Sequence, residues 1–230
     1  LGLVGSEMCI RDSYNRTHAK FVIIDNKTCL ITSGNFENYS FPYINTKGHR
    51  DFGIITNNKY VVDLFLEIFL DDFSMADPYT PITPYAPGEY GEPYTPKFNY
   101  NTIYVNANYI PVCTPEGAYY HIRRLIKRAK HFIYLLLPYA SETLRLVKRL
   151  INDIGNATNR GVSVLVITND TSFKTQLEAK GANVILFDPI NPSFPYPHGK
   201  LLIVDDKIVY VGSNNWSGTG LAISTGDKNR

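Results

Sequence analysis

Residues 18–35 read HAKFVIIDNKTCLITSGN, and residues 198–215 read HGKLLIVDDKIVYVGSNN. Both stretches fit the pattern H-x-K-x4-D-x6-[G/T]-S-x-N, which a typical chain rarely contains even once. Two copies in register indicate an internal repeat, a feature to be weighed before any other. The matched pairs are His18 and His198, Lys20 and Lys200, Asp25 and Asp205, Ser33 and Ser213, and Asn35 and Asn215.

Each stretch predicts a β-hairpin. In the first copy, apolar runs at 20–24 and 28–31 flank an Asp-Asn-Lys turn, and in the second the runs lie at 201–204 and 208–211. Asp and Asn are turn residues, so the chain should reverse there. Side chains two apart on a strand point to one face, which places His and Lys together. The returning strand brings the serine and asparagine back toward them.

This residue set suits a phosphodiester. Lysine and asparagine can donate to its two non-bridging oxygens. The reaction also needs a nucleophile and a proton donor for the leaving oxygen. Two histidines, with ordinary pKa values near ~6.5, can fill both roles without a metal. The pattern therefore predicts phosphodiester chemistry with neither a metal nor a cofactor.

The doubled pattern resembles the signature of the phospholipase D superfamily, whose members pair two such motifs across a pseudo-twofold axis. The resemblance extends over residues 14–230, with the specific motifs at 17–40 and 197–217. It implies an α/β phospholipase D-like fold with two pseudo-symmetric mixed β-sheet domains flanked by helices. It also implies an enzyme of the phospholipase D or cardiolipin synthase-like phosphatidyltransferase type, which works through a phosphohistidine.

The resemblance implies a role for each matched residue. His18 would be the nucleophile and His198 the general acid, although the near symmetry of the copies leaves the reverse order open. Water or another alcohol would then resolve the phosphohistidine. The phosphoryl group would be held by Lys20, Lys200, Asn35 and Asn215, with support from Ser33 and Ser213. Asp25 and Asp205 are catalytic candidates whose turn positions also suit a structural role.

Family members usually carry an acidic residue after each motif, often in the sequence Asn-Arg-Glu, and this acid orients a catalytic histidine. His49-Arg50-Asp51 fills that place after the first motif, so Asp51 is expected to orient His18. His49 would be an ordinary loop histidine or stand in for the family's asparagine. After the second motif the chain stops at Asn229-Arg230, where the acid would come next. We therefore expect a cut C-terminus and a His198 without its orienting acid.

The chain divides into four segments. Residues 1–13 resemble translated read-through of a sequencing adapter and are left out of the fold prediction, although a genuine strand and loop is the alternative. Residues 14–76 would be the C-terminal part of the first half, whose domain is expected to be incomplete. Residues 77–100 interleave prolines with tyrosines, which excludes helix and central strand and predicts an extended linker. Residues 101–230 would form the second half.

Hydrophobic periodicity predicts the remaining elements. The first half should contain a strand at 51–56 and a helix over 60–73. The second half alternates strands with helices, which indicates an α/β layer with a largely parallel sheet. Strands are expected at 102–105, 131–137, 162–168 and 184–187, and helices from the Thr114 cap to 129, over 141–151 with Ser141 as cap, and over 172–180, ended by Gly181.

Composition limits the partners. The net charge is only +2, so the chain lacks the basic field of a general nucleic-acid binder. The expected partner is a phosphodiester, with phospholipid favoured over nucleic acid and with peripheral contact to a membrane. No stretch approaches the ~18–20 apolar residues that span a bilayer. The three cysteines lack metal-ligand spacing and support no disulfide framework. The compartment stays open, with a membrane-associated or extracytoplasmic one favoured.

Two rival functions remain. The first is a metal-independent nuclease of the same superfamily, because the motifs recognise the phosphodiester and not its substituents. The second is a non-catalytic module that binds an anion or a partner, which the intact motifs argue against. Both motifs lie in one chain, so no oligomer is needed to form a site.

Overall fold

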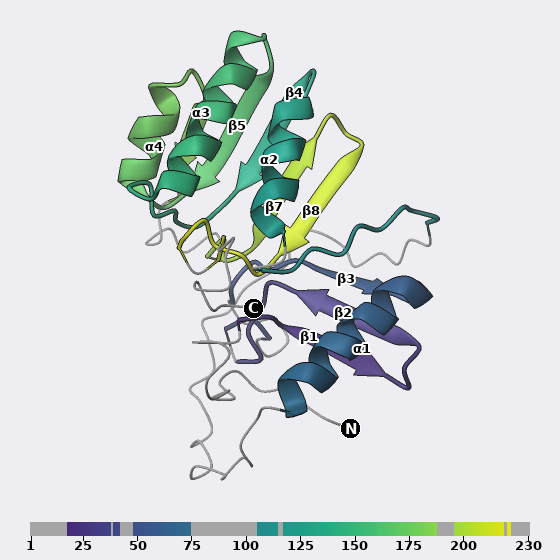
Figure 1. Ribbon diagram of the computed structural model, residues 1–230. Coiled ribbons are helices and arrows are strands. Elements are labelled where there is room, and N and C mark those ends of the chain that lie inside the picture. Colours follow the sequence, from purple (N-terminus) through teal and green to yellow (C-terminus); the bar gives the residue numbers. More distant parts are fainter. Residues whose placement is uncertain are drawn as a thin grey trace.

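A computed structural model describes residues 18–37, 39–41, 48–74, 105–114, 117–187, 196–218 and 220–221. These residues form two β-sheets, each packed against helices (Figure 1). The segments predicted at 1–13 and 77–100 lie outside the described residues. No helix within the described ranges is long and apolar enough to cross a membrane.

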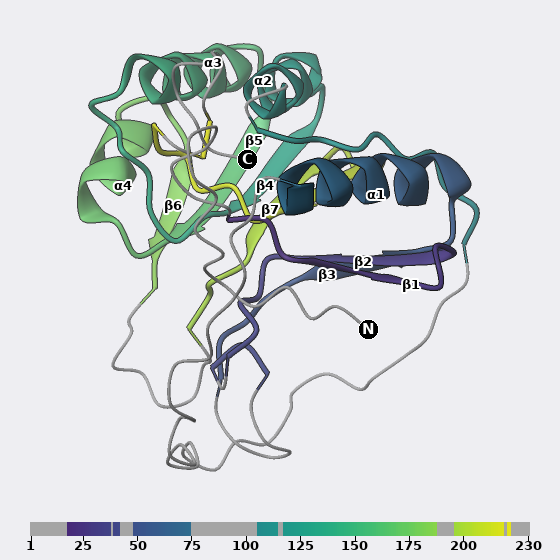
Figure 2. The same ribbon diagram turned by 60° about the horizontal axis from the view of Figure 1, so that its bottom comes forward.

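The smaller sheet belongs to the first half of the chain. It contains β1 (Phe21–Ile24), β2 (Thr28–Thr32) and β3 (Gly53–Thr56), paired antiparallel in that order. The helix α1 (Lys59–Ser74) covers one face, as Figure 2 shows. Between helix and sheet lies a small buried core of Cys29, Val61, Val62 and Phe65. The predicted hairpin, strand and helix are confirmed, with shifts only at their ends.

The larger sheet belongs to the second half and is mixed. Its strands are β4 (Phe132–Leu136), β5 (Ser163–Thr168), β6 (Asn183–Leu186), β7 (Lys200–Val204) and β8 (Ile208–Gly212), in the order β6-β5-β4-β7-β8. β4, β5 and β6 are parallel, whereas β7 runs antiparallel to both β4 and β8. The helices are α2 (Ala118–Arg128), α3 (Arg145–Asn159) and α4 (Thr171–Glu178). Figure 2 shows α2 and α3 side by side over one face.

The burial of β4 alternates along the strand, although a continuous apolar run such as 131–137 is typical of a buried strand. Ile133 and Leu135 are buried under the helices, but Tyr134 between them is 41% exposed on the other face. Strand side chains alternate between faces, so a sheet with helices over one face leaves every second residue outside the core.

Two helices begin later than their predicted caps. α2 starts at Ala118 because Thr114 serves another purpose: its hydroxyl donates to the carbonyl of Gly220 at 3.1 Å and accepts from the amide of Asn214 at 2.7 Å. α3 starts at Arg145 because the backbone N–H of Ser141 bonds the carbonyl of Trp216 at 2.8 Å. Both candidate caps instead tie the chain to the segment after β8.

Other ends differ for local reasons. α3 runs on past the predicted end at 151 because Ile154 and Ala157 continue its buried face. α4 begins one residue early, with the carboxylate of Asp170 accepting from the N–H of Phe173 at 3.0 Å. Gly181, at φ 82°, ends that helical segment as predicted. Val105 is not in a strand, and the rest of the strand expected at 102–105 lies outside the described residues.

The two hairpin turns are alike. Asp25 and Asn26 both have φ 52°, while Asp205 and Asp206 have φ 54° and 51°. Two consecutive residues at positive φ match the right-handed twist of a hairpin, and Asp and Asn tolerate this conformation best after glycine. The shared turn chemistry explains why both motifs keep an aspartate there.

Asp205 anchors the start of β4. Its carboxylate accepts from the backbone N–H groups of Lys130 at 2.9 Å, His131 at 2.8 Å and Phe132 at 3.0 Å. Burial would raise the pKa of Asp205, but these donors outweigh it and lower the pKa. The residue lies at the end of β7 opposite to Lys200. Of the two roles open to Asp205, this geometry supports the structural one, and the exposed Asp25 occupies the matching turn.

Candidate active site

The two halves meet through backbone hydrogen bonds. The N–H of Arg50 donates to the carbonyl of Tyr196, and the N–H of Gly199 donates to the carbonyl of Arg50, both at 2.7 Å. A Cβ on Gly199 would lie 2.3 Å from Cδ2 of Phe52, so the two segments approach this closely only because the residue is glycine. The contact carries the second motif onto the segment that follows the first.

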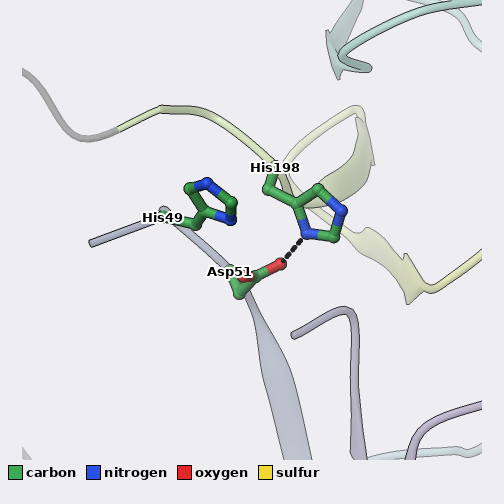
Figure 3. Close-up of side chains that lie close together, drawn as sticks. All are labelled: His49, Asp51 and His198. Atoms are coloured by element: carbon green, nitrogen blue, oxygen red, sulfur yellow. Dashed lines mark hydrogen bonds and ion pairs between the residues drawn. The ribbon is translucent and has the colours of Figure 1, made fainter. Parts of the chain in front are cut away.

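His198 is held by a carboxylate from the other half. Its Nδ1 lies 2.8 Å from Oδ1 of Asp51, as Figure 3 shows. The hydroxyls of Ser33 and Ser40 donate to the two oxygens of the same carboxylate at 2.7 and 2.9 Å. Burial would raise the pKa of Asp51, but the hydrogen bonds from His198 and the serines lower it to about 2. The carboxylate is therefore ionised and fixed in direction.

This pairing corrects the sequence prediction. Asp51 was expected to orient His18, and His198 was expected to lack its acid. The structure pairs Asp51 with His198 across the two halves instead. The reason lies in the register: β3 runs antiparallel to β2, which leaves Asp51 against Ser33, and the Arg50–Tyr196 contact then brings His198 over it.

Lys200 lies against the opposite side of the His198 ring. Its ammonium donates to the carbonyl of His198 at 2.8 Å and lies 3.2 Å from Nε2. Nδ1 thus faces a carboxylate and Nε2 faces an ammonium, which assigns the Nδ1–H tautomer to the neutral ring. Lys20 makes the equivalent contact in the first motif, donating to the carbonyl of His18 at 2.6 Å.

The two lysines are buried in one region. Lys20 is 7% exposed and Lys200 only 2%. Burial, and then the charge of Lys200, lower the pKa of Lys20 to about 7, against the opposing effects of Asp51 and Glu37. Burial lowers the pKa of Lys200 to about 8, against the effect of Asp51. An anion bound between them would offset both effects, since it favours the charged form of each lysine.

The lowered lysine pKa values predict a pH-dependent stability. Between pH 7 and 10.5 the unfolded chain binds more protons than the folded one at Lys20, so the free energy of unfolding should rise with pH across this window. Lys20→Met should raise that free energy near neutral pH by a few kcal/mol, since one pKa unit is about 1.4 kcal/mol. The variant should also weaken the dependence of the free energy of unfolding on pH between pH 7 and 10.5.

Urea unfolding at a series of pH values measures this effect. The matched control is Lys27→Met, which removes an exposed lysine from the neighbouring turn. Equal changes in the two variants, or a free energy of unfolding that falls as the pH rises from 7, would contradict the burial argument.

The serines and asparagines predicted to hold the phosphoryl group have different surroundings in the structure. Ser33 is fully buried, and besides bonding Asp51 its hydroxyl accepts from the N–H of Phe52 at 3.0 Å. The amide of Asn35 donates to Glu37 at 2.9 Å. Asn215 has a buried Oδ1 without a hydrogen-bond partner among the described residues. Ser213 is half-buried at the end of β8. The serine of the first motif thus serves the carboxylate.

The prediction missed a third imidazole. His49 stacks on the ring of His198, with centroids 5.4 Å apart, and on the ring of Tyr39 at 5.3 Å, while Tyr196 lies tilted at 5.2 Å. Burial, and then the charge of His198, lower the pKa of His49. Its position before Arg50-Asp51 was visible in the sequence, but its proximity to His198 depends on the long-range Arg50–Tyr196 contact.

Residues 122–227 match the family model described as "Cardiolipin synthase, PLD-like domain". A comparison with curated protein sequences gives no match. Among solved structures, phosphatidylserine synthase of Haemophilus influenzae Rd KW20 aligns with a TM-score of 0.58 and 15% identity over 90% of this chain. The chain spans 56% of the length of that synthase. The likeness confirms an α/β fold in which a mixed sheet is flanked by helices.

Two smaller proteins also align, over less of the chain. Nuc from Salmonella typhimurium, described as a phospholipase D family member, is 19% identical, with a TM-score of 0.40 over 48% of this chain and 73% of its own. NucT from Helicobacter pylori is 20% identical, with a TM-score of 0.37 over 46% of this chain and 70% of its own.

Proposed function

We propose that this chain is a phosphodiesterase of the phospholipase D superfamily, and that it cleaves or transfers phosphodiesters through a phosphohistidine, which the family model matching residues 122–227 supports. The observation that supports this most is the contact between the halves. Asp51 of the first half holds His198 of the second at 2.8 Å, and the charge of Lys200 lowers the pKa of Lys20. Groups from both motifs therefore act on one another, as a shared reaction centre requires.

In the proposed reaction, His18 attacks phosphorus and forms the P–N bond while the P–O bond to the leaving alcohol breaks. His198 gives its Nε2 proton to that leaving oxygen. Water or a second alcohol then attacks phosphorus, the P–N bond breaks, and His198 takes up the proton of the attacking group. Asp51 stabilises the imidazolium of His198 and fixes the direction of its ring, as a buried carboxylate does for a catalytic histidine.

The lysines hold the non-bridging oxygens in this proposal. Their burial excludes water, which strengthens each contact to a phosphate in the transition state. Lys200 also lies 3.2 Å from Nε2 of His198, the atom that would transfer the proton. The negative charge of the bound diester would balance the positive charges of the two neighbouring buried ammonium groups.

Phospholipid is the substrate we favour over nucleic acid. The net charge of +2 provides no long-range attraction for a polyanion. The site is flanked by exposed aromatic side chains: Tyr39, which stacks on His49, is 65% exposed and Phe41 is 52% exposed. Such rings suit the interface between lipid and water. The matching family model is also named for cardiolipin synthase.

A direct comparison of substrates tests the proposal. Vesicles of phosphatidylglycerol and phosphatidylcholine, and single-stranded DNA, are incubated with the chain in the presence of a chelator. We expect the alcohol to be released from the lipid and the DNA to remain intact. Cleavage of DNA alone would support the nuclease alternative. Turnover of neither substrate, with no phosphohistidine trapped, would support the non-catalytic alternative.

A further inference from the structure

We infer that His49, Asp51 and His198 form a binding site for a transition-metal ion of the Zn²⁺ type, and that the bound ion blocks proton transfer by His198. The three residues each offer a ligand atom, and these atoms lie within 4.8 Å of one another. Only the blocking effect rests on the proposed function, because binding of the ion follows from the geometry alone.

The distances suit a small tetrahedral ion. Nδ1 of His198 and Oδ1 of Asp51 are 2.8 Å apart. Zinc binds such ligands at about 2.0–2.2 Å, which separates tetrahedral ligand atoms by roughly 3.3 Å. The His198–Asp51 pair therefore has to open by about 0.5 Å, and the ligand nitrogen of His49, within 4.8 Å of the other two ligand atoms, has to move closer by up to about 1.5 Å.

His49 provides the third ligand. Figure 3 shows one nitrogen of its ring facing the His198–Asp51 pair. Its Nδ1 is buried and has no hydrogen-bond partner among the described residues. A buried polar atom without a partner is unfavourable, and an ion would provide the missing contact. Tyr39 and Tyr196 contact the ring and keep it beside the His198–Asp51 pair.

The surrounding residues resemble those of a metal site. The hydroxyls of Ser33 and Ser40 donate to the two oxygens of Asp51 and so fix the carboxylate. Such contacts around a ligand commonly orient it toward an ion. Two imidazoles and one carboxylate, with the fourth position open to water, form a ligand set that zinc prefers, whereas Mg²⁺ and Ca²⁺ prefer oxygen ligands. The ammonium of Lys200 opposes the ion, while Asp51 and Glu37 attract it.

The bound ion would stop the reaction through the tautomer of His198. It replaces the proton on Nδ1, which is released to solvent, and the hydrogen bond to Asp51 becomes a shared coordination. The remaining proton of the ring is then on Nε2. Transferring it would leave an imidazolate, a far less stable product than neutral imidazole. His198 therefore keeps its proton while the ion is bound, and a chelator restores turnover.

Metal binding is tested first, without any substrate. The chain is freed of metals with a chelator and then dialysed against Zn²⁺. We expect one equivalent to bind, and we expect His49→Asn to weaken binding at least about tenfold, since changes around metal ligands alone reach 10–100-fold. Bound Co²⁺ should show the visible absorption of tetrahedral coordination, which the variant should lack. The control is His131→Asn, which removes an exposed histidine at the start of β4.

Turnover is then measured with and without Zn²⁺. The ratio of the two rates should fall in the unchanged chain and in His131→Asn, and should stay near one in His49→Asn. Equal Zn²⁺ binding by the chain and by His49→Asn, or no binding by the chain, would overturn the site. Binding that leaves turnover unchanged would overturn the blocking effect. Binding as expected in a chain that turns over no diester would support the site and count against the proposed function.

Discussion

The chain with His198→Ala is expected to lose at least about 10⁴-fold in kcat, the scale seen when one member of a coupled catalytic set is removed. In the proposed reaction His198 is the group that protonates the leaving oxygen, and Lys200, 3.2 Å from its Nε2, holds a non-bridging oxygen instead. His18→Ala should have a similar effect, and the double variant should be little worse than either single one, since the two groups act as a unit.

A diester with an activated leaving group separates the two roles. A good leaving group needs no proton, so His198→Ala should still release one equivalent in a burst and then stall as a phosphohistidine on His18. His18→Ala should give no burst. The opposite pattern would reverse the assignment of nucleophile and acid. His131→Ala, which alters an exposed histidine, is the control and should behave like the unchanged chain.

Asp51→Asn is expected to lower kcat by about 10³–10⁴-fold, as the loss of the carboxylate behind a catalytic histidine does elsewhere. The asparagine oxygen can still accept from Ser33, and the hydroxyl of Ser40 can turn to accept from the amide N–H, so the local fold should persist. It lacks the charge that stabilises the imidazolium of His198 at 2.8 Å. With a diester whose activated leaving group needs no proton, the loss should be much smaller, because release of that group does not depend on proton transfer by His198.

Steady-state kinetics with an unactivated and an activated diester, with Asp63→Asn as the control, measures this. Asp63 forms an exposed ion pair with Lys59 on α1, so its variant removes one carboxylate of the same size. An equal loss of kcat with both diesters would indicate that Asp51 serves only the fold. An unchanged kcat would remove it from the site altogether.

The hairpins could be predicted because their information is local. Asp25-Asn26 and Asp205-Asp206 both occupy the positive φ that a two-residue reversal requires, and the flanking apolar runs have the strand period. The wrong helix starts have the opposite origin. Ser141 and Thr114 satisfy the local rule for a cap, but distant partners, Trp216 and Gly220, engage their polar groups instead.

The Asp51–His198 pair was beyond prediction for a related reason. The two residues are 147 positions apart in sequence, and spacing within one motif indicates only a partner in the same half. The choice between halves depends on long-range contacts, among them the Arg50–Tyr196 hydrogen bond and the close approach at Gly199, where the first copy has Ala19. That difference was visible, but only the packed structure shows that the glycine lies against Phe52.

The contact between the halves also delays assembly of the site during synthesis of the protein, because Asp51 is made before His198. A ribosome that adds about 5–20 residues per second needs roughly 7–30 s to pass from Asp51 to His198. During that interval the nascent chain holds one motif, a carboxylate with its serines, and no partner histidine. The proposed phosphodiester-cleaving centre is assembled only after His198 has been made, so it cannot attack the lipids or nucleic acids around a ribosome before then.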